Sequence, residues 1–145
     1  MPAMLRLVLD TNVVLDLLHW ADAGALPLLA ALEEGRAECL ADERTLAELR
    51  RVLAYPQLKL PPPAAAAHYA RYRALARLVP AGEAPQLPRC KDGDDQKFLE
   101  LAARARADIL VSKDKALLKL RGRSRLGFRI LEPTAACGEI ASFRA

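Results

Sequence analysis

The sequence predicts an α/β fold, a three-layer α/β/α sandwich with a central parallel sheet of four to five short strands. Two observations support this prediction. Short apolar runs of the kind found in buried parallel strands alternate with segments of helical spacing along the chain. The 145 residues contain no internal repeat and no low-complexity linker, so we expect a single domain over 1–145. Strands that alternate with helices favour a parallel sheet covered on both faces.

The first half of the chain predicts two strands and three helices. Pro27 near the start of the second helix and Gly35 at its end fit the usual positions of these residues. Asp42 is a natural N-cap for the third helix, which Pro56 ends. The expected strands span 4–9 and 36–41, and the expected helices span 13–20, 26–35 and 43–55.

The second half predicts four helices and two strands. Three prolines at 61–63 introduce an alanine- and arginine-rich helix, and a proline-containing loop over 80–91 follows it. The runs DILVS and FRILE predict strands, and Pro133 begins the last helix. The expected helices span 64–79, 94–107, 115–120 and 133–143, and the expected strands span 108–112 and 128–132.

Composition narrows the class of protein. The chain has 22 Lys and Arg against 18 Asp and Glu, a net charge of +4 that suits an anionic partner. Its three cysteines are widely spaced, so we expect reduced thiols rather than a disulfide framework or a Cys-x-x-Cys metal site. No window approaches the roughly 18 to 20 apolar residues of a membrane span, and the first residues lack a signal region. We therefore expect a cytoplasmic protein that does not contact a membrane.

Acidic residues recur where predicted strands end and helices begin. Asp10 and Asp114 each follow a predicted strand, and Glu48 lies in the helix that follows another. Three further acids crowd into residues 92–95, at the start of a helix. In open parallel sheets, ligands bind outside the carboxyl ends of the strands. We therefore expect these carboxylates to lie along one edge of the sheet.

Each acid also has an ordinary explanation as part of a helix cap, worth about 1 kcal/mol. Asp10 and Asp114 stand directly before predicted helices, and Glu48 has the spacing of a capping box with Thr45. Capping accepts several residue types, however, whereas here acids recur at every junction that should face the same edge. Gathered carboxylates raise one another's pKa unless a cation neutralises them. Oxygen ligands without nearby His or Cys favour Mg²⁺ or Mn²⁺.

Four stretches together resemble the PIN domain family. They are VLDTNVV, the acid in TLAELRRVL, DGDDQKFLELAARARADILVSKDKALL and the FRIL strand that follows. The resemblance runs from about residue 5 to 133 and is to small prokaryotic toxin components of toxin-antitoxin pairs, the VapC-like ribonucleases. It depends on the order and spacing of the motifs. Gly93 stands where the family often has proline, and Ser112 where it often has threonine.

The resemblance implies an acidic metal site for Mg²⁺ or Mn²⁺. Its catalytic and metal-ligating residues would be Asp10, Glu48, Asp95 and Asp114, with Asp92 as a close fifth. Gly93 is expected to loosen the turn, which leaves the choice between Asp92 and Asp95 as the primary ligand open. Thr11, Asn12 and Ser112 would support these acids by hydrogen bonding. The resemblance further implies a homodimer and an antitoxin protein that occludes the acidic pocket.

Such a site predicts hydrolysis of RNA by a metal-activated water, with no serine, cysteine or histidine nucleophile. Asp10, Asp95 and Asp114 would be ligands, and Glu48 either a ligand or a base that orients the water. We expect His19 and His68 to be packing or surface residues.

A basic surface beside the acids is expected to bind the RNA backbone. The candidates are Arg44, Arg50, Arg51, Lys113, Lys115 and the cluster over 119–125, and each also fits a solvated helix face or loop. Aromatic residues make up only 5% of the chain, so no stacking platform for single-stranded bases is evident from the sequence.

Two other functions compete with this one. Phosphoryl-transfer domains also group aspartates around Mg²⁺, but the phosphatase pattern requires Asp-x-Asp after the first strand, where this chain has Asn12. A receiver domain would have its acidic pair after the first strand rather than at 94–95. An inactive PIN-like RNA-binding protein is disfavoured by the near-complete set of acids. We therefore predict a metal-dependent endoribonuclease, the toxin of a type II toxin-antitoxin pair.

Overall fold

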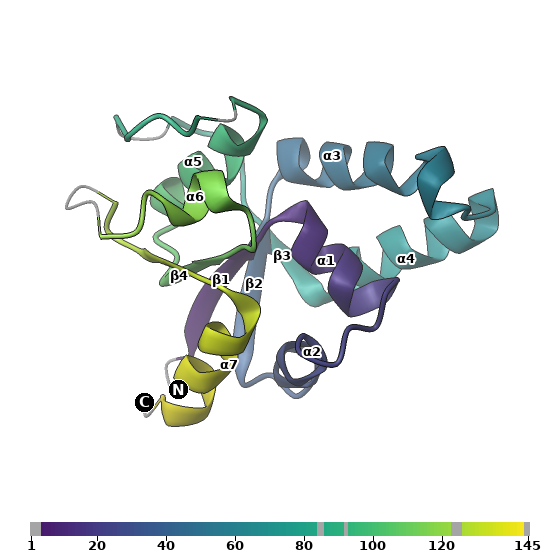
Figure 1. The fold of residues 1–145 in the computed structure, drawn as a ribbon, viewed down its shortest axis with the longest axis horizontal. Helices are drawn as coiled ribbons and strands as arrows, with labels where there is room; N and C mark the ends of the chain where they lie inside the picture. Colours follow the sequence, from purple (N-terminus) through teal and green to yellow (C-terminus); the bar gives the residue numbers. More distant parts are fainter. Residues whose placement is uncertain (1–3, 84–85, 92, 123–125, 144–145) are drawn as a thin grey trace.

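Five parallel strands form the centre of the fold in the part of the chain that the computed structural model describes, residues 4–83, 86–91, 93–122 and 126–143 (Figure 1). The strands are β1 (Leu5–Leu9), β2 (Ala37–Ala41), β3 (Ala76–Leu78), β4 (Ile109–Val111) and β5 (Arg129–Leu131). The α-helices are α1 (Thr11–Leu18), α2 (Leu26–Glu33), α3 (Glu43–Leu53), α4 (Pro62–Leu75), α5 (Gln96–Arg104), α6 (Lys115–Leu118) and α7 (Pro133–Ser142). Two 3-10 helices are η1 (Pro56–Leu58) and η2 (Gly93–Asp95). Within these ranges, none of the helices is both long and apolar enough to cross a membrane.

The order of the strands in the sheet is β3-β2-β1-β4-β5, and every neighbouring pair is parallel. The chain builds outward from β1 through β2 to β3, then crosses to the other side of β1 to add β4 and β5. The strand order therefore reverses between β1 and β4. In open α/β sheets, ligands bind at the carboxyl ends of the strands beside such a reversal. The residues that directly follow β1 and β4 stand at this position.

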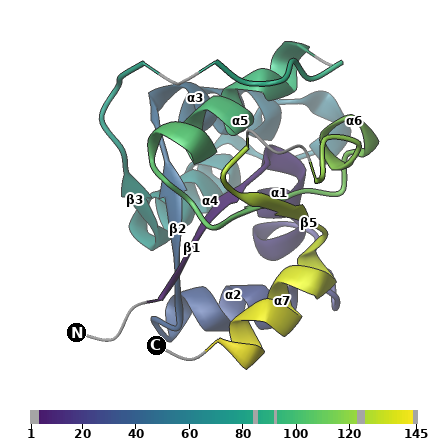
Figure 2. The same ribbon diagram turned by 90° about the vertical axis from the view of Figure 1, so that its left-hand side faces the viewer.

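Alternate side chains of β1 enter two separate hydrophobic cores, as expected for a strand buried on both faces. Leu7 and Leu9 pack in a core with residues of α1, α2, α3 and α7, whereas Val8 packs in a core with residues of α5 and α6. Figure 1 shows α5 and α6 on one side of the strands and α1 and α4 on the other. Figure 2 shows α2 and α7 side by side. The predicted three-layer sandwich is confirmed, with five strands.

The prediction of one helix over 64–79 is wrong at both ends. Helix α4 ends at Leu75, and the next three residues form β3, which pairs with β2 from Cys39↔Ala76 to Ala41↔Leu78. Ala, Arg and Leu all favour helix. The open edge of β2 nevertheless supplies backbone hydrogen-bond partners, and this tertiary context overrides the local preference. The helix also begins earlier, at Pro62, because proline is tolerated in a first helical turn.

Side-chain caps decide where α1 and α3 begin, and a 3-10 turn precedes α5. Helix α1 begins at Thr11, two residues before the predicted start, because Asp10 accepts a hydrogen bond from the Val13 amide. Asp42 forms a capping box with Thr45 at the start of α3, so the alternative pairing of Thr45 with Glu48 is wrong. Asp94 and Asp95 belong to η2 instead of the α-helix predicted over 94–107.

A thiol and a phenol share a buried position between β2 and α4. Cys39 is fully buried, Tyr72 is 4% exposed, and their side chains hydrogen-bond each other. Burial raises the pKa of Cys39 to about 12, and burial also raises the pKa of Tyr72 well above its usual value. Both groups therefore stay neutral in the folded protein at a pH where the unfolded chain ionises them.

This difference predicts a loss of stability at alkaline pH. Below pH 9 neither state ionises Cys39, whereas above pH 9 only the unfolded state does, so the free energy of unfolding falls as the pH rises toward 12. Between pH 9 and pH 10.5 the Cys39 contribution is about 2 kcal/mol, from roughly 1.4 kcal/mol for each pKa unit. Urea denaturation followed by circular dichroism checks this value. The Cys39→Ala variant should show a flatter pH dependence, and equal slopes for both proteins would contradict the expectation.

Candidate functional site

Four acids from four separate segments line one pocket at the carboxyl ends of β1 and β4. Asp10 follows β1, Glu48 lies on α3, Asp95 ends η2, and Asp114 follows β4. The pocket has a volume of about 190 Å³, and the other residues that line it are Thr11, Asn12, Val52 and Phe98. Predicted acids that lie up to 104 residues apart in the sequence are thus brought around one cavity.

Asp10 is the most enclosed of these acids, with only 4% of the residue exposed. Its Oδ1 accepts a hydrogen bond from the Val13 amide at 3.0 Å, and its Oδ2 accepts one from the Ser112 hydroxyl. Burial raises the pKa of Asp10, and the nearby charges of Asp114 and Glu48 raise it further, whereas the two hydrogen bonds act in the opposite direction. The buried carboxylate is therefore in an environment that an added cation would stabilise.

Ser112 links the two strand ends that carry Asp10 and Asp114. While its hydroxyl donates to Asp10, its Oγ accepts a hydrogen bond from the Asp114 amide at 2.9 Å. The Asp114 carboxylate accepts from the Ala116 amide at 2.7 Å and so caps α6. The capping explanation therefore holds for the local structure of both aspartates. It does not account for their position around the same pocket as Glu48 and Asp95.

Glu48 is held from two sides. The Thr11 hydroxyl donates to Oε2 of Glu48, and the Lys97 ammonium group donates to Oε1 at 2.7 Å. Lys97 also donates to the Asp94 carbonyl oxygen at 2.6 Å, and only 16% of its side chain is exposed. A lysine thus partly balances the negative charge of this pocket. Lys97 was not among the residues predicted from the sequence, because its contact with Glu48 joins segments that lie 49 residues apart.

Asp94 and Asp95, two of the three acids at 92–95, lie in different surroundings. Asp95 lines the pocket and makes no side-chain capping hydrogen bond with α5, and Asp94 is exposed. The next residue, Gln96, accepts from the Cys90 amide at 2.7 Å and donates to the Pro88 carbonyl at 3.2 Å. These two bonds attach the preceding loop to the start of α5 and so fix the backbone beside Asp95. Asp92, the fifth acid of the predicted set, lies outside the described residues.

The donors of this pocket suit a hard cation, since they are carboxylate oxygens together with the Thr11 hydroxyl and the Asn12 amide. Neither His nor Cys is among the residues that line it. In the described part of the chain, no three Asp, Glu, His or Cys side chains already form a group able to hold a metal ion. Binding of a cation would therefore require the carboxylate oxygens around this pocket to come closer together.

Some of the predicted RNA-binding residues form ion pairs within the protein, and others are exposed to solvent. Arg44 pairs with Glu100 at 2.8 Å, and Lys113 pairs with the buried Asp16, whose hydrogen bond raises the pKa of Lys113. Two further candidates are exposed, Arg51 on α3 and Lys115 at the start of α6. In the cluster over 119–125, the last three residues lie outside the described ranges.

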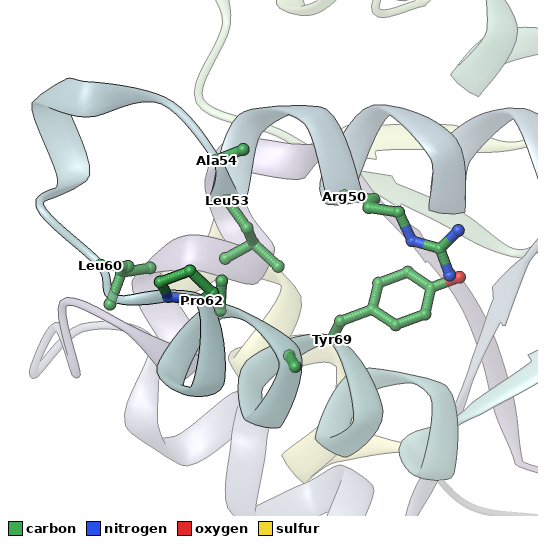
Figure 3. A pocket seen from close by; sticks show the side chains of 8 residues that line it. Arg50, Leu53, Ala54, Leu60, Pro62 and Tyr69 are labelled. Carbon is green, nitrogen blue, oxygen red and sulfur yellow. The ribbon is translucent and has the colours of Figure 1, made fainter.

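A larger cavity, of about 450 Å³, lies between α3 and α4 (Figure 3). Its lining is mainly apolar and includes Leu53, Leu60 and Pro62. Arg50 stacks on Tyr69 at one end, with the guanidinium carbon 4.4 Å from the ring centroid. The residues that line it include no acid, so it offers none of the metal-binding chemistry of the pocket around Asp10.

A family model described as PIN domain matches residues 6–116, which is 111 of the 145 residues. That range contains all four acids of the pocket, together with Lys97 and Ser112. No curated protein matches the chain, and no solved structure matches it either.

Proposed function

The chain belongs to the PIN domain family, whose members are generally nucleases, and on this premise we propose that it is a Mg²⁺- or Mn²⁺-dependent endoribonuclease. The observation that carries this proposal is the convergence of Asp10, Glu48, Asp95 and Asp114 on one pocket at the reversal of strand order. Helix capping accounts for Asp10 and Asp114 but not for the presence of Glu48 and Asp95 around the same cavity. A shared cation would account for all four.

Each residue then has a part in the reaction. Asp10, Asp95 and Asp114 hold the metal, and Asp92 remains a candidate fifth ligand. When bound, the ion lowers the pKa of a water molecule and neutralises charge on the phosphodiester. Glu48 either joins the ligands or accepts a proton from the attacking water. Ser112 and Thr11 hold Asp10 and Glu48 by the hydrogen bonds described above. Asn12, at the same pocket, can orient the substrate.

The biological partners are part of the same proposal. The net charge of +4 supports an RNA substrate, whose phosphates the exposed Arg51 and Lys115 would contact. Arg44 and Lys113 would contribute less to phosphate binding, because their charges are paired with Glu100 and Asp16. A toxin role, a homodimer and an antitoxin that covers the acidic pocket are supported by the resemblance of the sequence motifs to VapC-like proteins. Growth arrest on expression in a bacterial host, relieved by co-expression of a neighbouring small reading frame, would test the toxin role. Unchanged growth on expression would contradict it.

A second candidate is a PIN-like protein that binds RNA without cleaving it. Two observations favour this alternative. The Lys97 ammonium group is hydrogen-bonded to the Glu48 carboxylate, and no group of acids among the described residues is already arranged as metal ligands. Both would follow if the site no longer bound a metal ion. The two candidates differ in whether the pocket binds Mn²⁺ and whether purified protein cleaves RNA.

Metal binding should stabilise the folded protein. At a Mn²⁺ concentration 100 times the dissociation constant, the gain is about 2.7 kcal/mol, which corresponds to a rise in Tm of roughly 5–10 °C for a domain of this size. Differential scanning calorimetry with EDTA and then with Mn²⁺ measures it. In parallel, cleavage of a single-stranded RNA pool should require Mg²⁺ or Mn²⁺ and stop with EDTA. An unchanged Tm at millimolar Mn²⁺, with intact RNA, would favour the inactive candidate.

A further inference from the structure

A further cavity adjoins the acidic pocket and shares two of its residues. It has a volume of about 260 Å³ and is lined by Asn12, Asp16, Trp20, Lys113 and Asp114. Asn12 and Asp114 also line the acidic pocket. We propose that this cavity, the Trp20 pocket, binds one unpaired base of the RNA, next to the phosphodiester that is cleaved. The inference rests on the proposed function and adds a substrate-binding residue to it.

Trp20 is unusual because it is both large and exposed. It is the only tryptophan of the chain, and 57% of it is accessible to solvent. An exposed indole offers a flat π surface on which any nucleobase can stack, and stacking of this kind does not require a particular base. The low aromatic content of the sequence gave no reason to expect a stacking surface. Composition does not reveal that the one tryptophan lines a cavity beside the acidic pocket.

One histidine contacts the indole, and a second histidine contacts the first. The His19 ring meets Trp20 edge-on, with ring centroids 4.4 Å apart and planes at 60°. The His68 ring of α4 meets His19 in turn, with centroids 5.7 Å apart. These contacts connect the segment after α1 to α4. A side chain that is already held in place loses less conformational freedom on binding, which favours a recognition role over a random surface position.

The charges of the Trp20 pocket suit a base better than a phosphate. Lys113 is paired with Asp16, so its positive charge is already balanced. Asp114 adds a further carboxylate, which would repel a phosphate held inside the cavity. A base is neutral, and the Asn12 amide, the Asp16 carboxylate and the Lys113 ammonium group together offer donors and acceptors for its polar edge.

The position of the pocket connects base binding to the reaction. Asn12 and Asp16 belong to α1, whereas Lys113 and Asp114 follow β4, so the cavity spans the same reversal of strand order as the acidic pocket. Because Asn12 and Asp114 line both cavities, a nucleotide whose base stacks on Trp20 would have its neighbouring phosphate at the acidic pocket, where a bound cation would offset the negative charge of the carboxylates. Base binding would thereby select single-stranded RNA, because a paired base is already stacked within a duplex.

The fluorescence of Trp20 reports on this pocket directly. We expect a single-stranded octaribonucleotide to quench the emission of the wild-type protein in EDTA, where RNA is not cleaved and the metal site plays no part. An octamer of abasic sites carries the same phosphates and should not quench, and a perfect RNA duplex should not quench either. Equal quenching by the abasic octamer, or none by the base-bearing one, would overturn the proposal.

Matched variants measure the size of the effect. Trp20→Ala should weaken binding of a fluorescein-labelled octamer roughly tenfold or more in an anisotropy titration, and Trp20→Phe should retain most of the affinity. Tyr55→Ala is the control, because Tyr55 is 50% exposed and lines neither the Trp20 pocket nor the acidic pocket. Wild-type affinity in Trp20→Ala, or an equal loss in Tyr55→Ala, would overturn the proposal.

The outcomes separate this proposal from the nuclease proposal. Quenching by base-bearing RNA without any cleavage in Mn²⁺ would support the Trp20 pocket and contradict the nuclease function. Cleavage with an unchanged KM in Trp20→Ala would support the nuclease function and overturn the Trp20 pocket. If both proposals hold, Trp20→Ala raises KM roughly tenfold with little change in kcat, because the indole binds substrate away from the reacting atoms.

Discussion

Replacement of Asp10 by asparagine is expected to lower RNA cleavage with Mg²⁺ or Mn²⁺ at least about 100-fold, because the variant loses a charged metal ligand. The fold should tolerate the change. Asparagine caps helices about as well as aspartate, so the bond from the Val13 amide is retained. Since burial raises the pKa of Asp10, removal of its charge should leave stability unchanged or increased. Single-turnover cleavage of labelled RNA and thermal denaturation measure the two effects.

Asp108 provides a matched control for this experiment. It directly precedes β4, at the opposite end of the strand from Asp114, and its carboxylate accepts from the Arg6 amide at 2.8 Å. Asp108→Asn changes the net charge by the same amount and should keep wild-type cleavage. The metal-site assignment is wrong if Asp10→Asn cleaves as fast as the wild type. It also fails if both variants lose activity equally, because the effect would then follow from overall charge.

The largest loss of stability is expected from Asp42→Ala, at about 3–5 kcal/mol. Asp42 accepts from the Thr45 amide at 2.9 Å and from Arg104 Nη2 at 3.0 Å. The side chains of Asp42 and Arg104 are only 4% and 10% exposed. Alanine at 42 removes the cap of α3 and leaves the Arg104 guanidinium buried without its counter-charge. Urea denaturation followed by circular dichroism measures the cost.

The double variant Asp42→Ala with Arg104→Met tests the physical reason. Because methionine removes the unpaired charge and keeps an apolar side chain, the double variant should be more stable than Asp42→Ala alone. If the stability loss of the double variant equals the sum of the losses of the two single variants, the buried-pair explanation is wrong. Loss of the α3 cap would then account for the effect of Asp42→Ala. Asp42 does not line the acidic pocket, so folded Asp42→Asn protein should still cleave RNA. Retained cleavage in Asp42→Asn, against lost cleavage in Asp10→Asn, would distinguish the structural role of Asp42 from the metal-binding role proposed for Asp10.

Much of the fold could be predicted because its signals are local. The apolar run before Asp10 reads as a buried strand, and its two faces enter two cores, as an all-apolar strand requires. The edge strand at 76–78 could not be predicted, because its residues favour helix and only the backbone of β2 makes them extended. Lys97 shows the same limit, since its place in the sequence does not reveal that its ammonium group contacts Glu48, 49 residues away.

For the candidate site, the sequence by itself determined which acids stand after strands and before helices, because capping and strand ends depend on neighbouring residues. The order and spacing of its motifs also carry the family resemblance, which implies Asp10, Glu48, Asp95 and Asp114 as the site residues. Only the tertiary structure decided that these acids share one pocket with Lys97 beside them, because this depends on β4 being placed against β1. The same crossing brings Lys113 to Asp16 and forms the Trp20 pocket. Contacts between distant segments follow from how the sheet is assembled, which no local pattern encodes.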